Sequence, residues 1–126
     1  MKRSVVVLTR NPADSVGLSE IIVAHRLVAL PLSCLDAVEG ALDGGEVLAI
    51  IIDLDGFTID NRFIRRLKGR FPDTTILLAS SRREHPHLET AMVEYVYACL
   101  VKPIDPEEIG YWLKCIAADG PAPAGG

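Results

Sequence analysis

The sequence predicts an α/β protein whose five-stranded parallel sheet is covered by helices on both faces. Five short apolar segments alternate with five helix-like segments along the chain, and such alternation is typical of parallel βα units with right-handed crossovers. The apolar segments are largely unbroken, as expected of strands buried on both faces. The 126 residues are enough for one hydrophobic core and too few for two.

The predicted strands are short and rich in β-branched or aliphatic residues. In chain order they are Ser4–Leu8, Ala29–Leu32, Val47–Ile52, Thr75–Ala79 and Ala98–Val101. The third, VLAIII, has the strongest strand pattern and is expected at the centre of the sheet. Pro31 interrupts the second, and because proline cannot donate to a neighbouring strand, we place that strand at or near an edge.

The predicted helices are indicated by apolar spacing and by capping residues. They cover Val16–His25, Cys34–Leu42, about 61–71, Leu88 to about Tyr95, and a last helix from Asp105-Pro106 onward. Ser33 is the expected cap of the second helix, and Asp60 or Asn61 opens the third. Residues 120–126, GPAPAGG, have the composition of a flexible tail or linker, so one domain is expected over residues 1–119.

Composition excludes several classes of protein. Apolar residues make up 49% of the chain and charged residues 24%, an ordinary globular balance. The net charge of −4 gives no reason to expect binding to nucleic acid or to an anionic membrane. No signal peptide or membrane-length apolar run is visible, and Cys34, Cys99 and Cys115 lack metal or disulfide spacing. We therefore expect a cytoplasmic protein with buried, reduced thiols.

Polar side chains follow three of the strands. Asp53 and Asp55 come after the third strand, Ser80 ends the fourth, and Lys102 precedes Pro103 after the fifth. In open α/β sheets, ligands bind outside the carboxyl ends of the strands. An acid, a hydroxyl and an amine are therefore expected to meet at this edge.

This pattern resembles the receiver domain of bacterial two-component response regulators. The segments PDTTILLASS and CLVKPIDPEEIGYWL are similar to that family's fourth-strand and fifth-strand regions, and the resemblance covers about residues 3–118. It implies a flavodoxin-like (CheY-like) doubly wound fold, a phosphoacceptor role for Asp53, and phosphate-contact roles for Ser80 and Lys102. A nucleophile, a neutral donor and a fixed cation would then surround developing negative charge.

Two features depart from the family pattern. The family holds Mg²⁺ with an acidic pair after its first strand, where this chain has Thr9 and Arg10. Magnesium needs oxygen ligands and arginine offers only donors, so Asp53 and Asp55 are weak metal candidates and no cofactor is expected. Cys99 replaces the family's switch aromatic.

Arg10 has two arrangements open to it. It can make a charge-assisted contact with Asp53, which would lock the site in one electrostatic state, or it can extend along the surface into solvent.

Three functions are open. The first is a non-enzymatic signalling module, a pseudo-receiver that acts by protein–protein contact, because the missing acids argue against phosphorylation at Asp53. The second is a working phosphoacceptor that a histidine kinase phosphorylates on Asp53. The third, a small flavodoxin-like nucleotide or flavin binding domain, needs a phosphate-binding loop that Thr9-Arg10-Asn11-Pro12 does not resemble.

The expected partners are proteins. The resemblance implies a histidine kinase or a fused output domain, and leaves open a homodimer through the fourth helix, fifth strand and fifth helix. Candidate interface residues on that face are Met92, Tyr95, Tyr97, Tyr111 and Trp112. The basic run of residues 62–70 and the histidines of His85-Pro86-His87 are expected to be solvated surface rather than a nucleic-acid or metal site.

Overall fold

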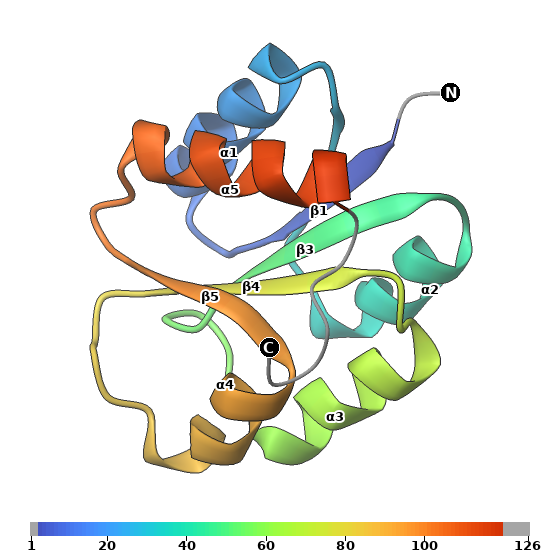
Figure 1. Cartoon of the computed structure of the whole chain (residues 1–126). Coiled ribbons are helices and arrows are strands. Elements are labelled where there is room, and N and C mark those ends of the chain that lie inside the picture. The colour runs from blue at the N-terminus through green and yellow to red at the C-terminus, as the bar shows by residue number, and fades with distance from the viewer. Residues whose placement is uncertain (1–2, 120–126) are drawn as a thin grey trace.

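The computed structural model describes residues 3–119, which form one parallel sheet between two layers of helices (Figure 1). The strands are β1 (Ser4–Leu8), β2 (Val28–Leu32), β3 (Val47–Asp53), β4 (Thr75–Ser80) and β5 (Val96–Val101). All neighbouring strands pair in parallel, in the order β2-β1-β3-β4-β5. This confirms the predicted doubly wound α/β fold, with β3 at the centre and the proline-containing β2 at an edge.

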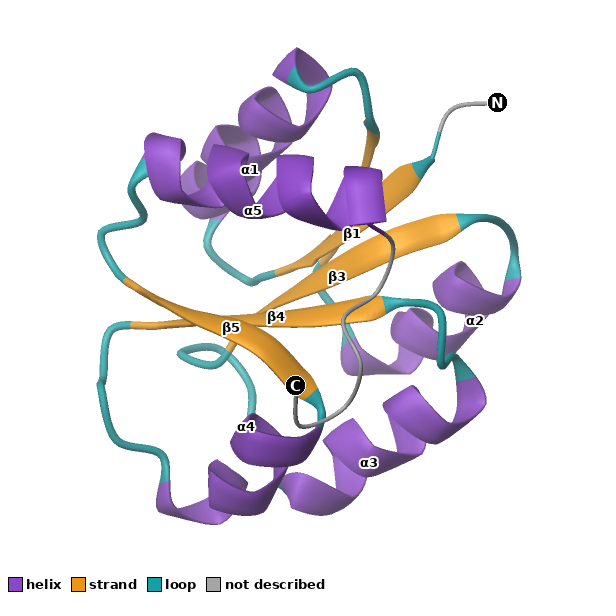
Figure 2. Ribbon diagram, viewed as in Figure 1, coloured by secondary structure: helices purple, strands orange, loops and turns teal. Residues whose placement is uncertain are grey.

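Helices cover both faces of the sheet (Figure 2). Their bounds are α1 (Pro12–Ala24), α2 (Val38–Asp43), α3 (Asn61–Arg70), α4 (Glu89–Glu94) and α5 (Pro106–Asp119), with 3₁₀ turns Leu35–Ala37 and Pro86–Leu88 before α2 and α4. Helices α1 and α5 lie on one face, and α2, α3 and α4 lie on the other. Among residues 3–119, no helix has the length and apolar character needed to cross a membrane.

Alternate residues of each central strand pack into different cores, as the two-residue period of a strand requires. In β1, Val5 and Val7 pack with the residues of α1 and α5, whereas Val6 and Leu8 pack with those of α2, α3 and α4. All four side chains are fully buried. Burial on both faces explains why these strands lack the polar alternation of a half-exposed sheet.

Several helix starts differ from the predictions. Helix α1 begins four residues earlier than expected, because Asn11 caps it by accepting hydrogen bonds from the N–H groups of Ala13 and Asp14, and Pro12 occupies its first position. The predicted Ser33 cap is wrong: the turn before α2 starts after Cys34 without a side-chain cap. The prediction for α3 is confirmed, with Asp60 accepting from the N–H of Phe63.

The cysteine prediction holds only in part. Cys99 and Cys115 are half-buried, but Cys34 is exposed. Cys34 lies in the irregular segment between β2 and the following turn, where neither helix layer covers it.

Helices α1 and α5 approach closely at one glycine. A Cβ atom at Gly110 would lie 3.0 Å from Cε1 and 3.1 Å from Nε2 of His25. His25 follows α1, and its Nδ1 is hydrogen-bonded to the carbonyl of Ile21 at 2.9 Å. This bond restricts the movement of the ring, so the close packing at this point depends on glycine.

We predict that Gly110→Ala destabilises the fold by about 1 kcal/mol or more, because the added methyl overpacks the His25 contact. Gly17→Ala in α1 is the matched control, since no atom lies within 4 Å of its added Cβ; it is expected to stabilise by about 0.5–1 kcal/mol through lower chain entropy. Urea unfolding of both variants measures the difference. Equal stabilisation by the two substitutions would contradict the prediction.

Candidate functional site

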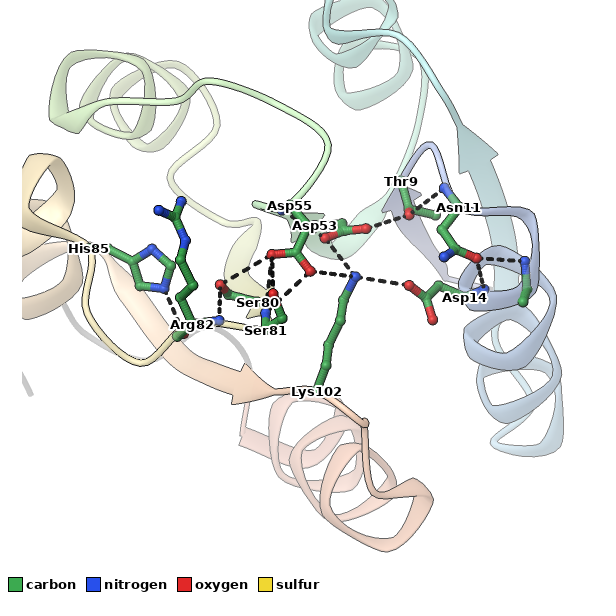
Figure 3. A network of polar contacts seen from close by, with 11 residues as sticks. Thr9, Asn11, Asp14, Asp53, Asp55, Ser80, Ser81, Arg82, His85 and Lys102 are labelled. Carbon is green, nitrogen blue, oxygen red and sulfur yellow. Dashed lines mark hydrogen bonds and ion pairs between the residues drawn. The ribbon is translucent and has the colours of Figure 1, made fainter.

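Polar side chains from four segments meet at the carboxyl edge of the sheet (Figure 3). Asp53 ends β3, Ser80 ends β4, Lys102 directly follows β5, and Asp14 lies in the first turn of α1. A backbone hydrogen bond of 2.8 Å from the N–H of Lys102 to the carbonyl of Ser80 fixes the end of β5 beside β4. Parallel pairing thus places the predicted acid, hydroxyl and amine side by side.

The ammonium group of Lys102 lies among three carboxylates. Its Nζ is 2.9 Å from Oδ2 of Asp14, 2.9 Å from Oδ1 of Asp53 and 3.1 Å from Oδ2 of Asp55. Three charge-assisted contacts match the three donors of an ammonium group. The side chain of Lys102 is only 16% exposed, so these carboxylates replace most of its hydration.

Asp53 is buried and both of its carboxylate oxygens are engaged. Oδ2 accepts a hydrogen bond of 2.7 Å from the hydroxyl of Thr9, and Oδ1 accepts one of 3.0 Å from the N–H of Asp55 in addition to the Lys102 contact. The Thr9 hydroxyl itself accepts from the N–H of Asn11 at 3.1 Å. Thr9 therefore donates to Asp53 from a position where the resembled family has an acid.

Asp55 is held from the β4 side. Its Oδ1 accepts from the N–H and the hydroxyl of Ser81 at 3.1 and 3.0 Å. Ser80 is less involved: its hydroxyl lies 3.5 Å from Oδ1 of Asp55 and accepts from the N–H of Arg82 at 3.0 Å.

The pKa shifts follow from this network. Burial alone would raise the pKa of Asp55, but the hydrogen bonds from Ser81 and the contact with Lys102 together hold it below its usual value. Burial alone would lower the pKa of Lys102, but the hydrogen bonds to Asp14, Asp53 and Asp55 raise it well above its usual value. Both groups are therefore charged at neutral pH.

The postulated contact between Arg10 and Asp53 is wrong. Arg10 is exposed, and its guanidinium lies over the ring of Phe57, 4.8 Å from the centroid. The carboxylate of Asp53 already makes an ion pair with Lys102 and accepts a hydrogen bond from Thr9. A second cation therefore has no free carboxylate oxygen to bind. The surface arrangement of Arg10 is the one that the structure adopts.

Cys99 offers no substitute for an aromatic switch. It is half-buried against the core formed with α2, α3 and α4, and burial raises the pKa of its thiol. Tyr97 packs instead with the opposite core, where its ring meets Trp112 edge-on at 5.4 Å. The two residues therefore differ in the core that they contact, although they are two positions apart in the strand.

The residues present do not fit a magnesium ion. Lys102 Nζ contacts one oxygen each of Asp14, Asp53 and Asp55, and Thr9 and Ser81 donate to the remaining oxygens of Asp53 and Asp55. Among residues 3–119, no group of three or more His, Cys, Asp or Glu residues is arranged to hold a metal. Asp53 and Asp55, the weak metal candidates, act here as partners of an internal cation.

Sequence reasoning missed two residues of this network. Asp14 is not among the predicted site residues, although it lies in the first turn of α1 and its carboxylate accepts from Lys102 across the sheet edge. Ser81 donates twice to Asp55. No local motif indicates either role, because each depends on how two separated segments meet.

The candidate interface residues are less exposed than expected. Met92 and Tyr95 pack against one core, and Tyr97 and Trp112 against the other, all half-buried. Only Tyr111 is clearly exposed, at 60%. Val93 of α4 and Val101 of β5 add exposed apolar surface to the same face and were not anticipated.

Comparison with known proteins finds similarity in structure only. No family model matches the chain, and no curated protein matches its sequence. The fold is similar to a response regulator from Thermotoga maritima, with a TM-score of 0.82, 13% identity and coverage of 94% of this chain and 100% of the other. It is also similar to the signal receiver domain of an HD domain-containing protein from Pseudomonas fluorescens. The TM-score is 0.82, the sequence identity is 17%, and the match covers 94% of this chain and 96% of the other.

A third similar structure has a different description. It is a pilus assembly-related protein from Burkholderia pseudomallei, with a TM-score of 0.74, 22% identity and coverage of 92% of this chain and 90% of the other. At these identities the three likenesses establish the fold, which is that of receiver domains.

We predict that Lys102→Met destabilises the fold by about 1–3 kcal/mol at neutral pH, because it leaves three close carboxylates without their cation. The loss should shrink as the pH falls and the carboxylates become neutral. Lys114→Met, at an exposed position of α5, is the control. Urea unfolding at pH 7 and pH 4 measures both; a loss equal at the two pH values would contradict this account.

We predict that Asp55 contributes to stability only above the acid range. Because its pKa is lowered on folding from 3.8, its contribution is complete above about pH 4 and is lost as the pH falls through the folded-state value. The unfolding free energy of Asp55→Asn should therefore depend less steeply on pH below about pH 4 than that of wild type. Glu94→Gln, at an exposed position of α4, should keep the wild-type slope.

Proposed function

We propose that the chain is a receiver-like signalling module that acts by binding another protein, and that Lys102 serves as the permanent cation of its acidic site. The observation that carries this proposal is the position of Lys102 Nζ, within 3.1 Å of the carboxylates of Asp14, Asp53 and Asp55. The receiver fold brings the strand ends of the site together, and the contacts of Lys102 with three carboxylates limit the chemistry available there.

The geometry argues against efficient phosphorylation of Asp53. Phosphoryl transfer depends on cations that neutralise charge on the transferred group, and Lys102 is already shared by three carboxylates. The Oδ2 atom of Asp53 also holds a 2.7 Å hydrogen bond from buried Thr9, which an incoming phosphoryl group would have to displace. We therefore assign the chain no enzymatic activity and no metal cofactor.

The site is also a poor match for a nucleotide or flavin. Phosphate groups bind the free N–H groups at a helix N-terminus, but the first N–H groups of α1, from Ala13 and Asp14, are taken by the side chain of Asn11. The pocket at this helix start, beside Thr9 and Arg10, measures about 210 Å³. Small-molecule sites are typically about 300–1,000 Å³.

The partner is a protein, either a histidine kinase or an output domain attached to the chain. Exposed Val93, Val101 and Tyr111 on the α4–β5–α5 face provide apolar contact area of the kind found in interface centres. A second candidate is a component of a pilus assembly machine, because the pilus assembly-related structure has higher identity, 22%, than the two receiver structures, at 13% and 17%. Both candidates use the domain as a binding module.

The test is incubation with Mg²⁺ and a small acyl phosphate, followed by intact mass measurement. We expect no added phosphoryl group on the wild-type chain. The double variant Thr9→Asp/Arg10→Asp restores an acidic pair at the end of β1 and is expected to gain one phosphoryl group, because carboxylates there can hold Mg²⁺.

The control is Asp53→Asn in both backgrounds, which should abolish any gain. A phosphoryl group on the wild-type chain that disappears with Asp53→Asn would overturn the proposal and establish a working phosphoacceptor. A bound chromophore in the purified protein would instead favour the flavin-binding function.

A further inference from the structure

Helix α3 presents a row of arginines to solvent. Ile64 and Leu67 face the core, whereas the exposed positions carry Arg62, Arg65, Arg66, Gly69 and Arg70. These positions have the i, i+3, i+4, i+7, i+8 spacing of one helix face, and α3 contains no acidic residue. The row is strongly basic in a chain whose net charge is −4.

The neighbouring helix carries an acidic row. Val38 and Leu42 are buried, whereas the exposed positions of α2 and its flanking residues are Asp36, Ala37, Gly40, Asp43 and Gly44. The two acids alternate with residues that have small or absent side chains. A Cβ at Gly40, like one at Gly69 of α3, would meet no atom within 4 Å, so both rows are open to close approach.

One residue joins the two rows within the molecule. Glu39 accepts from Arg66 at 3.0 Å through Oε1 and from Arg70 at 2.9 Å through Oε2. Each oxygen of one carboxylate thus binds a different guanidinium. Among the described residues, Arg62, Arg65, Asp36 and Asp43 make no ion pair, so two acids and two arginines on this surface are uncompensated.

These positions are complementary under a two-fold rotation. Because β2, β1, β3 and β4 are parallel, α2 and α3 run in the same direction across the sheet. Asp36 lies about one turn before Glu39, Arg62 lies about one turn before Arg66, and Arg65 directly precedes Arg66. A two-fold axis that runs parallel to the two helices and midway between them therefore places α3 of one copy over α2 of the other. Asp36 of one copy then lies at the height of Arg62 and Arg65 of the partner copy.

We propose that the α2–α3 surface is a homodimer interface in which the arginines of each α3 bind two aspartates of the partner copy, Asp36 in the turn before α2 and Asp43 at the end of α2. The contact is isologous, so every ion pair occurs twice. Exposed ion pairs are individually weak, and the dimer is accordingly weak and sensitive to salt. This surface lies apart from the Lys102 site and from the α4–β5–α5 face, so the inference does not depend on the proposed function.

Sedimentation equilibrium of the full chain at about 0.05 M and 0.5 M salt, up to about 0.5 mM protein, tests the proposal. We expect a monomer–dimer equilibrium whose dissociation constant rises at least about tenfold at the higher salt. Arg62→Glu/Arg65→Glu and Asp36→Lys/Asp43→Lys should each weaken association by at least about tenfold through like-charge contacts.

An equimolar mixture of the two charge-reversed variants should form a heterodimer, because the reversed charges are again complementary. The control is Arg82→Glu/Arg83→Glu, which changes the net charge by the same amount as Arg62→Glu/Arg65→Glu. Its positions are exposed in the β4–α4 loop, so it should leave the dimer intact. A wild-type chain that stays monomeric throughout overturns the proposal. So does a dimer that both reversals leave unchanged, or a mixture that forms no heterodimer.

Discussion

The ammonium group of Lys102 joins elements that are far apart in the sequence at one edge of the sheet. It contacts Asp14 in α1, Asp53 at the end of β3 and Asp55 in the following loop. Without the ammonium group, each carboxylate would repel the other two at this distance, so their arrangement depends on the cation between them. Ser81 and Thr9 then fix the remaining oxygens, which makes the loops around the site dependent on the same charge.

A cation that is part of the chain cannot dissociate from its site, whereas a bound metal can. A metal leaves when its concentration falls, and its open coordination positions accept new ligands. A lysine tethered to β5 stays at the site, and its three donors are already used. The raised pKa of Lys102 and the lowered pKa of Asp55 keep both of these groups charged across the physiological range.

The fold was predictable because its strongest signals are local. Apolar runs such as VLAIII and the capped start at Asp60 each specify their own element, and alternation along the chain specifies the parallel sheet. The site was only partly predictable. Asp53, Ser80 and Lys102 were found because strand ends must share an edge. Asp14 was missed because its role depends on where α1 crosses that edge, and the expected Arg10 contact failed because Thr9 and Lys102 had already taken the oxygens of Asp53.

The distribution of charge separates the surfaces of this small domain by the partners they can accept. At the site edge, one ammonium group is shared by three carboxylates, and the α4–β5–α5 face offers isolated apolar side chains. The α2–α3 surface carries opposite charges on adjacent helices, and the pairing of Glu39 with Arg66 and Arg70 is an internal example of the contact. Because a two-fold rotation exchanges those rows, the partner that best matches this surface is a second copy of the same chain, whereas a uniformly acidic partner would meet repulsion from Asp36 and Asp43.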